Sequence, residues 1–341
     1  MSMDATKELL TASRTTTALN CLRQHYYRYE LGLKPVEDAD ALLFGSAFHK
    51  SLEARANGAT FKDLFNVDEI ENFTDAKLYG LVGGYYRKWD GEADEIEHMK
   101  PEIEFGPDPI CGSRTFYGAG KIDGLAGLKD GRVALVEHKT TGEDIADGAD
   151  YWLRLSFNPQ IYKYWIALQD RGIVPDTVIY DVVRKPTIKP GKDETPKDFA
   201  LRLLDDCTGE AVQAKTKAGE LRFTATGTPM WARRGADWYF KRRHVAITTA
   251  MVDEFKSQVR SVCHILTYVK GEARDMIAKG KDPATAWPRN CNGFVCDQCG
   301  YRAVCHGRVT IDPNCPPAGF KIAPPNEELS VAPGPEADGM K

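Results

Sequence analysis

The sequence predicts an α/β protein whose core is a mixed sheet flanked by helices. Residues 102–141 consist of short apolar or alternating runs separated by turn signals, which is typical of successive strands. A helix follows, with Pro159 in its first turn and Gly172 at its end. The apolar run at 176–185, "DTVIYDVVRK", then predicts a buried strand. Three strands, a helix and a further strand favour helices packed on a mixed sheet.

Helical patterns lie on both sides of this core. Residues 13–33 and 41–58 carry apolar side chains at helical spacing, and 61–100 predicts further helix that flexes at the glycine pair in "LVGGYY". A long helix is expected over 247–278, because its apolar residues recur at intervals of three and four. We expect that stripe to pack into the core.

These patterns divide the chain into five segments, which differ in composition and in the residues they carry. They are an N-terminal helical region (1–100) with Cys21 and His49, the core (101–185), an arm rich in basic and aromatic residues (186–250), a C-terminal helix with a cysteine cluster (251–315) and a Pro-rich, disordered tail (316–341).

Composition is that of a globular protein, with 42% hydrophobic and 28% charged residues and a net charge of −4. No apolar run reaches the roughly 20 residues that cross a bilayer, and the N-terminus lacks the apolar segment of a signal peptide. We therefore expect a cytoplasmic protein with no membrane partner. The charge argues against coating nucleic acid with the whole surface, but it leaves room for a local basic channel.

The stretch 120–141, "GKIDGLAGLKDGRVALVEHKTT", predicts a hairpin that carries unusual charges. Glu137 and Lys139 share one face of their strand and His138 points to the other, while Asp123 lies across the hairpin. The charges form either an ion-paired surface or a metal site. Two carboxylates suit Mg²⁺ or Mn²⁺, and a lysine beside them can stabilise negative charge on a phosphoryl group.

The nine cysteines favour metal ligation over disulfides, since their number is odd and no export signal precedes them. Five bunch near the C-terminus: Cys291, Cys296, Cys299, Cys305 and Cys315. Three thiolates at the spacing of 296, 299 and 305 can wrap one metal centre, but a tetrahedral site or a cubane cluster needs a fourth. Cys291 would complete a local zinc site.

Residues 231–244, "WARRGADWYFKRRH", interleave basic and aromatic side chains, which neutralise phosphates and stack on unpaired bases. The alternative is a solvated strand pair with a buried aromatic side. The DNA-binding candidates are Arg233, Arg234, Trp238, Tyr239, Lys241, Arg242 and Arg243. No phosphate-binding Gly-x4-Gly-Lys-Ser/Thr loop is present, which argues against a built-in ATP-driven motor.

Four stretches occur in an order typical of one nuclease family: "LLFGSAFHKSLE", "GKIDGLAGL", "LVEHKTT" and "NPQIYKYWIAL". Together they make the chain resemble the PD-(D/E)XK nuclease superfamily, in particular the RecB-type and CRISPR-associated-type iron–sulfur exonucleases, including phage-encoded members. The resemblance covers 13–185 and 286–306. It implies a restriction-endonuclease-like sheet and an iron–sulfur staple that joins the N- and C-terminal segments.

The resemblance also implies roles for the charged hairpin. Asp123 and Glu137 correspond to the metal-binding carboxylates and Lys139 to the catalytic lysine of a Mg²⁺- or Mn²⁺-dependent enzyme.

Three further residues take roles from the same resemblance. His49 becomes an additional metal ligand, and Gln160 and Tyr164 become catalytic-site residues that line the active site or DNA channel. Considered alone, His49 suits a hydrogen-bonded core histidine. Gln160 and Tyr164, one helical turn apart, suit a capping and packing pair.

For the cysteines, the resemblance supplies a fourth ligand from the N-terminal helix. Cys21 stands in the matching context, so Cys21, Cys296, Cys299 and Cys305 are expected to hold a [4Fe–4S] cluster. Spacing alone leaves Zn²⁺ open, with Cys291 as the competing ligand.

The expected function is that of a metal-dependent DNA exonuclease acting on single-stranded ends in recombination, repair or phage DNA processing, with a recombination protein as a further partner. Two alternatives come from other classes. One is a catalytically silent DNA-binding or adaptor module of the same fold, and the other is a zinc-stabilised interaction module.

Overall fold

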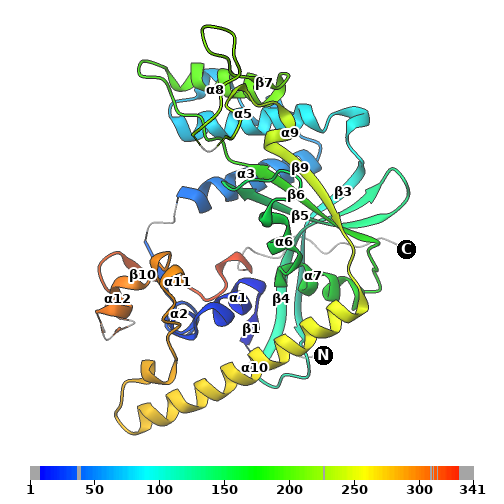
Figure 1. The fold of residues 1–341 in the computed structure, drawn as a ribbon. Helices are drawn as coiled ribbons and strands as arrows, with labels where there is room; N and C mark the ends of the chain where they lie inside the picture. Colours follow the sequence, from blue (N-terminus) through cyan, green and yellow to red (C-terminus); the bar gives the residue numbers. More distant parts are fainter. Residues whose placement is uncertain are drawn as a thin grey trace.

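The computed structural model describes residues 8–36, 40–225, 227–307, 309, 311–312 and 314–329. At its centre lies a six-stranded sheet in the order β1-β4-β5-β6-β9, with β3 also paired to β4 (Figure 1). Its strands are β1 (Glu8–Leu10), β3 (Ile96–Pro109), β4 (Phe116–Leu128), β5 (Val133–Thr141), β6 (Thr177–Arg184) and β9 (Phe240–Val245).

The sheet is mixed, as predicted. Strand β4 is antiparallel to β3 and β5, and β6 is antiparallel to β9, whereas β1 runs parallel to β4 and β5 parallel to β6. The turn between β4 and β5 lies where the sequence places it, since the Gly131 N–H donates to the Leu128 carbonyl at 2.9 Å.

Strand β4 has two partners on the edge opposite β3. Strand β1 pairs with residues 116–118 and β5 pairs with 124–127. Among the described residues, 119–123 pair with no strand on that edge, although β3 still pairs along most of the other edge. The sheet therefore opens between β1 and β5, and Asp123 lies at the border of this opening.

Helices cover both faces of the sheet (Figure 1). The apolar cluster on one face includes residues of α1 (Ala12–Asn20), α6 (Asp150–Ser156), α7 (Pro159–Gln169) and α10 (Thr249–Ala278). The cluster on the other face includes residues of α3 (Asp40–Ala56), α5 (Phe73–Lys88), α8 (Pro196–Thr208) and α9 (Ala236–Tyr239). Successive residues of β6 divide between the two, because Val182 packs in the first cluster and Val183 in the second.

The long C-terminal helix agrees with its prediction, but residues 13–33 do not form one helix. They form α1, α2 (Leu22–His25) and the π-helical η1 (Tyr26–Glu30). Cys21 interrupts them with an extended backbone, at φ −164° and ψ 116°. Asn290 stabilises the break, since its Nδ2 donates to the Asn20 carbonyl at 2.7 Å and its backbone N–H donates to Cys21 Sγ at 3.4 Å.

The glycines of α5 serve close packing and not the predicted flexing, because the helix is continuous across them. A Cβ on Gly80 would lie 2.6 Å from Leu203 Cγ, and one on Gly84 would lie 2.6 Å from Cys207 Cβ. Helix α8 thus approaches α5 more closely than larger side chains would allow. The helix predicted up to residue 100 ends earlier, because β3 begins at Ile96.

Segment 186–250 is less separate than an arm outside the core. Helix α8 buries Phe199 and Leu203 completely, and β9 is a strand of the main sheet. The smaller sheet of β7 (Val212–Gln213) and β8 (Trp231–Arg233) lies outside it.

The remaining elements are short. They are β2 (Leu33–Pro35), α4 (Phe61–Leu64), η2 (Val67–Glu69), η3 (Gly91–Ala93), η4 (Pro283–Ala286), α11 (Gly293–Asp297), α12 (Arg302–His306), β10 (Phe320–Ile322) and η5 (Glu327–Leu329). The predicted disorder from residue 316 is wrong for its first part, because β10 pairs with β2. The rest of that prediction, 330–341, lies outside the described residues. No helix in the described part of the chain is long and apolar enough to cross a membrane.

We predict that Gly84→Ala lowers the free energy of unfolding by about 1–3 kcal/mol, because the added methyl overpacks the contact with Cys207 and Phe240. Urea denaturation measures the change. Gly271→Ala in α10 is the matched control: nothing lies within 4 Å of its Cβ, so it is expected to raise stability by about 0.5–1 kcal/mol. Equal effects of the two substitutions would contradict the packing role.

Candidate active site and cysteine cluster

The carboxylate of Asp123 lies where the pairing of β4 and β5 ends. The last paired residues are Gly124 and Val136. One residue further, Asp123 Oδ2 accepts the backbone N–H of His138 at 2.9 Å. A side chain thus replaces the next hydrogen bond of the ladder, and it brings this carboxylate beside Glu137.

Glu137 and Lys139 begin a chain of polar contacts that leads to α7. Glu137 is completely buried and accepts a hydrogen bond from the Lys139 ammonium. Lys139 Nζ also donates to Gln160 Oε1 at 2.9 Å, and Gln160 Nε2 donates to the Tyr164 hydroxyl at 2.9 Å. The structure therefore brings together Asp123 and the four residues of this chain, although they come from three elements.

His49 approaches the same place from α3. Its Nδ1 lies 3.8 Å from Asp123 Oδ2, and its ring meets the His138 ring edge-on at 5.9 Å between centroids. Burial lowers the pKa of His49 to about 4, and the neighbouring His138 acts in the same direction. A neutral imidazole is the form that binds metals. This predicted residue thus lies beside the carboxylates.

The two carboxylates destabilise one another's charge. Burial raises the pKa of Glu137 to about 7, with Asp123 as the next contribution, and burial also raises the pKa of Asp123. The Glu137 Oε2 atom is buried and has no hydrogen-bond partner. Two adjacent carboxylates with a spare oxygen are hard donors, and they fit a divalent cation such as Mg²⁺ or Mn²⁺.

As the side chains stand, no group of three or more His, Cys, Asp or Glu residues in the described ranges could hold a metal ion. At the carboxylates, the Lys139 ammonium contacts Glu137 directly. A cation bound there would require the Lys139 ammonium to move away from Glu137. The oxygen donors of the two carboxylates fit a divalent cation, but in this structure the Lys139 ammonium pairs with Glu137.

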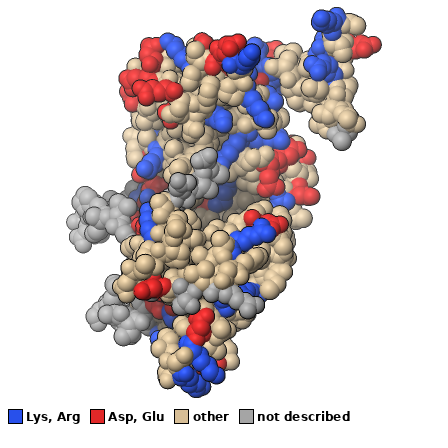
Figure 2. Space-filling model, turned by 90° about the vertical axis from the view of Figure 1, so that its left-hand side faces the viewer, with Lys and Arg blue, Asp and Glu red and all other residues tan. Residues whose placement is uncertain are grey.

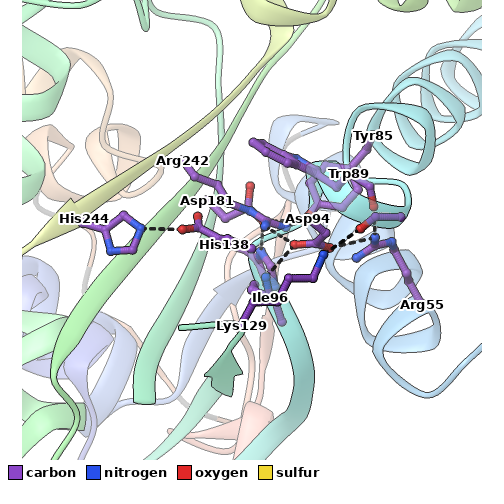
Figure 3. Close-up of polar contacts among 12 residues, drawn as sticks. Arg55, Tyr85, Trp89, Asp94, Ile96, Lys129, His138, Asp181, Arg242 and His244 are labelled. Atoms are coloured by element: carbon purple, nitrogen blue, oxygen red, sulfur yellow. Dashed lines mark hydrogen bonds and ion pairs between the residues drawn. The ribbon is translucent and has the colours of Figure 1, made fainter. Parts of the chain in front are cut away.

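The opposite face of β5 carries a second charged network, which the sequence interpretation missed (Figure 3). His138 Nδ1 lies 3.4 Å from Asp181 Oδ2 on β6, and Arg242 Nε on β9 lies 3.2 Å from the same oxygen. Tyr85 donates to that oxygen, and Arg242 reaches on to Asp94. Burial opposes ionisation of Asp181, yet Arg242 and His138 hold its pKa well below its usual range. An aspartate in the middle of an apolar strand was the available signal.

This network corrects part of the predicted DNA-binding set. The Arg242 side chain is only 3% exposed and pairs with two acids, Asp94 and Asp181. Tyr239 is completely buried, and its hydroxyl donates to Asp206. Both predictions are wrong, because these side chains face the interior.

The other members of that set are engaged within the protein. Arg233 pairs with Asp205 at 2.8 Å, Arg234 with Asp206 at 3.2 Å and Lys241 with Asp147 at 2.8 Å, while Trp238 lies under Arg184 and Arg243 lies over Trp152. That these five residues contact DNA stays a prediction, and DNA binding would compete with the contacts that they make within the protein.

The four predicted cluster cysteines line one cavity of about 250 Å³, although Cys21 comes from the other end of the chain. Burial raises the pKa of the Cys299 thiol, and Cys21, Cys305 and Cys296 raise it further, as neighbouring thiolates would. Cys291 is exposed and lines the cavity too.

Arginines and an aromatic stack surround this cavity. Arg23 and Arg289 line it, and Arg289 also donates to the Cys305 carbonyl at 3.0 Å. Tyr27 stacks on Tyr301 at 5.7 Å between centroids. Cysteine sulfurs are soft donors, so the donor chemistry suits an iron–sulfur cluster as well as zinc.

We predict that Asp123→Asn makes the metal-free protein more stable, by about 0.5–2 kcal/mol, because it removes a partly buried charge beside Glu137 and keeps an acceptor for the His138 N–H. Urea denaturation with a chelator present checks this. Asp253→Asn, at an exposed position of α10, serves as the control and should change little. A less stable Asp123→Asn protein would show that the carboxylates do not repel one another.

One of the comparisons with known proteins identifies the family. The family model described as "PD-(D/E)XK nuclease superfamily" matches residues 9–306. No curated protein matches the chain. A solved structure described as "Crystal structure of SSO0001" is 12% identical, with 61% of this chain and 77% of that chain covered, at a TM-score of 0.28. Because the family model spans most of the chain, this protein belongs to the PD-(D/E)XK nuclease superfamily.

Proposed function

We propose that the protein is a metal-dependent DNA exonuclease that hydrolyses phosphodiester bonds at single-stranded ends, in recombination, repair or phage DNA processing. The observation that carries the proposal is the position of Lys139. Its ammonium is shared between buried Glu137 and Gln160, next to a second, partly buried carboxylate, Asp123. A silent adaptor module would have no use for such a costly concentration of buried charge.

Each residue has a defined task in this proposal. Mg²⁺ or Mn²⁺ held by Asp123 and Glu137, with His49 beside them, would polarise the phosphodiester and ease deprotonation of the attacking water. Lys139 places positive charge where the phosphoryl oxygens become more negative. Gln160 fixes the direction of the lysine, and Tyr164 fixes the amide of Gln160.

Lys139→Met and Glu137→Gln are each expected to reduce the cleavage rate by roughly 10²–10³-fold or more, because each removes a charge that acts on the transition state. The assay is Mn²⁺-dependent digestion of 5′- and 3′-labelled single- and double-stranded oligonucleotides. Lys62→Met, at an exposed position of α4, is the control and should cleave normally. Folded wild-type protein that binds these strands but never cleaves them would favour the silent DNA-binding module.

We further propose that this is a RecB-type member in which Cys21, Cys296, Cys299 and Cys305 hold a [4Fe–4S] cluster. The shared cavity and the break of α1 at Cys21 support it. A cluster there would link the two ends of the chain, and closing so long a loop removes much entropy from the unfolded state. A zinc-stabilised interaction module would use the same cavity, with Cys291 available to it.

Cys21→Ala is expected to lose iron, visible absorbance and solubility together when the protein is purified without oxygen. Cys315→Ala is the matched control, since Cys315 is exposed and does not line the cavity, and it should keep all three. Metal analysis and the absorption spectrum measure the outcome. Full iron retention after loss of Cys21, or zinc in place of iron, would contradict the cluster.

A further inference from the structure

Two large apolar side chains are strongly exposed at the junction of α6 and α7. Phe157 is 72% exposed and Leu153 is 63% exposed. They stand four residues apart at the end of a helix, so they are neighbours on one face. Their helix is otherwise well packed, with Tyr151, Trp152 and Leu155 buried. The two side chains together offer an apolar surface that a ligand can cover.

The residue that follows this pair in the chain contacts the helix that carries Gln160. Asn158, which follows Phe157, caps α7 by accepting the Gln160 N–H at 3.0 Å. Gln160 in turn accepts the hydrogen bond of Lys139. Phe157 therefore lies three positions before Gln160, the residue that contacts the candidate catalytic lysine, Lys139.

The base of the ring is rigid. The Tyr180 hydroxyl on β6 donates to the Leu155 carbonyl at 2.7 Å, and the Tyr162 hydroxyl on α7 donates to the Ser156 carbonyl at 2.6 Å. Phe157 itself closes α6, since its N–H donates to the Arg154 carbonyl at 3.2 Å. The ring is presented by packed elements, which is the requirement for a stacking surface of low entropic cost.

A second exposed apolar pair approaches the site from α3. Leu42 and Leu43 are 58% and 55% exposed. Two residues further along α3, a Cβ on Gly45 would lie 3.3 Å from Thr140 Oγ1, so the start of this helix packs on the face of β5 that carries His138. We call Leu42, Leu43, Leu153 and Phe157 the apolar rim. Its first two residues lie on the helix that carries His49, and its last two lie just before α7, the helix that carries Gln160.

Positive charge accompanies the apolar rim. Lys50 is exposed one residue after His49, and Lys185 Nζ lies 5.4 Å from the centre of the Phe44 ring on α3. Figure 2 shows Lys and Arg side chains along a hollow between the upper and lower parts of the molecule. The loop between β5 and α6 carries three acidic residues that are already paired with basic ones: Glu143 with Arg154, Asp144 with Arg184 and Asp147 with Lys241.

A ligand that matches this surface needs flat apolar groups and negative charges in one molecule. An unpaired nucleotide strand has both, since its base faces are free to stack on aromatic side chains and its phosphates meet lysines. A duplex offers the phosphates but keeps its base faces stacked inside. The geometry points to Phe157, with Leu153 beside it, as the stacking platform for an unpaired base of the strand that enters the active site. This inference rests on the proposed nuclease function, and it names the residues that bind the unpaired strand.

Two measurements test the inference. Fluorescence anisotropy measures how tightly each protein binds a fluorescent single strand in a chelating buffer, and the Mn²⁺ cleavage assay measures activity. Phe157→Ala is expected to weaken single-strand binding about tenfold, and Phe157→Trp to restore it, because stacking requires a ring. Tyr268→Ala, a 66% exposed aromatic of α10, is the matched control and should bind as the wild type does. Circular dichroism establishes that each variant is folded.

A scan with one abasic nucleotide moved along the strand isolates the contact. At one position of the strand, the missing base should weaken binding by the wild-type protein by the same factor as Phe157→Ala does. The same missing base should not change binding by the Phe157→Ala protein, because the two changes remove the same interaction. Unchanged binding by Phe157→Ala, or an equal abasic effect in both proteins, would overturn the inference. If the coupling appears but the wild type never cleaves, the platform stands and the nuclease proposal fails. If the wild type cleaves and the coupling is missing, only the platform fails.

Discussion

The interruption along one edge of β4 determines the rest of the structure. Strands β1 and β5 share that edge and leave residues 119–123 between them without a partner among the described strands. Helix α7 approaches this opening, where the Gly120 position lies so near Tyr164 that an added Cβ would be 3.3 Å from the ring. Asp123 occupies the border and replaces a ladder bond with its carboxylate. The opening therefore leaves room for Asp123 to bind the His138 N–H and for α7 to bring Gln160 to Lys139.

The two faces of β5 hold buried charge for different purposes. On the α5 side, Asp181 and Arg242 belong to a network in which acids and bases pair, and removing one partner from such a network costs roughly 3–5 kcal/mol. On the α7 side, the Lys139 ammonium pairs with Glu137, and the second carboxylate, Asp123, lies beside them and accepts the His138 N–H. The paired network holds the strands in place, and the excess of negative charge on the other side suits a cation.

Local patterns predicted the parts of the site that depend on a single strand or helix. Parity placed Glu137 and Lys139 on one face, and helical spacing made Gln160 and Tyr164 neighbours, whereas the roles of these two residues in the site came from the family resemblance. The errors concern pairings distant in the chain. Arg242 lies in a basic, aromatic stretch that suggests DNA binding, but β9 joins the sheet beside Asp181, about sixty positions earlier, and so buries it. The break at Cys21 likewise depends on Asn290, which no local pattern near the N-terminus announces.

The central claim is that Asp123 and Glu137 form one cation site beside Lys139. Anomalous diffraction from a crystal of the protein soaked in Mn²⁺ tests it without reference to any substrate. The account predicts a peak about 2.1 Å from oxygens of both carboxylates, with the Lys139 ammonium moved away from Glu137. A peak at other residues, or a lysine that still contacts Glu137 in crystals where Mn²⁺ is bound elsewhere, would contradict it.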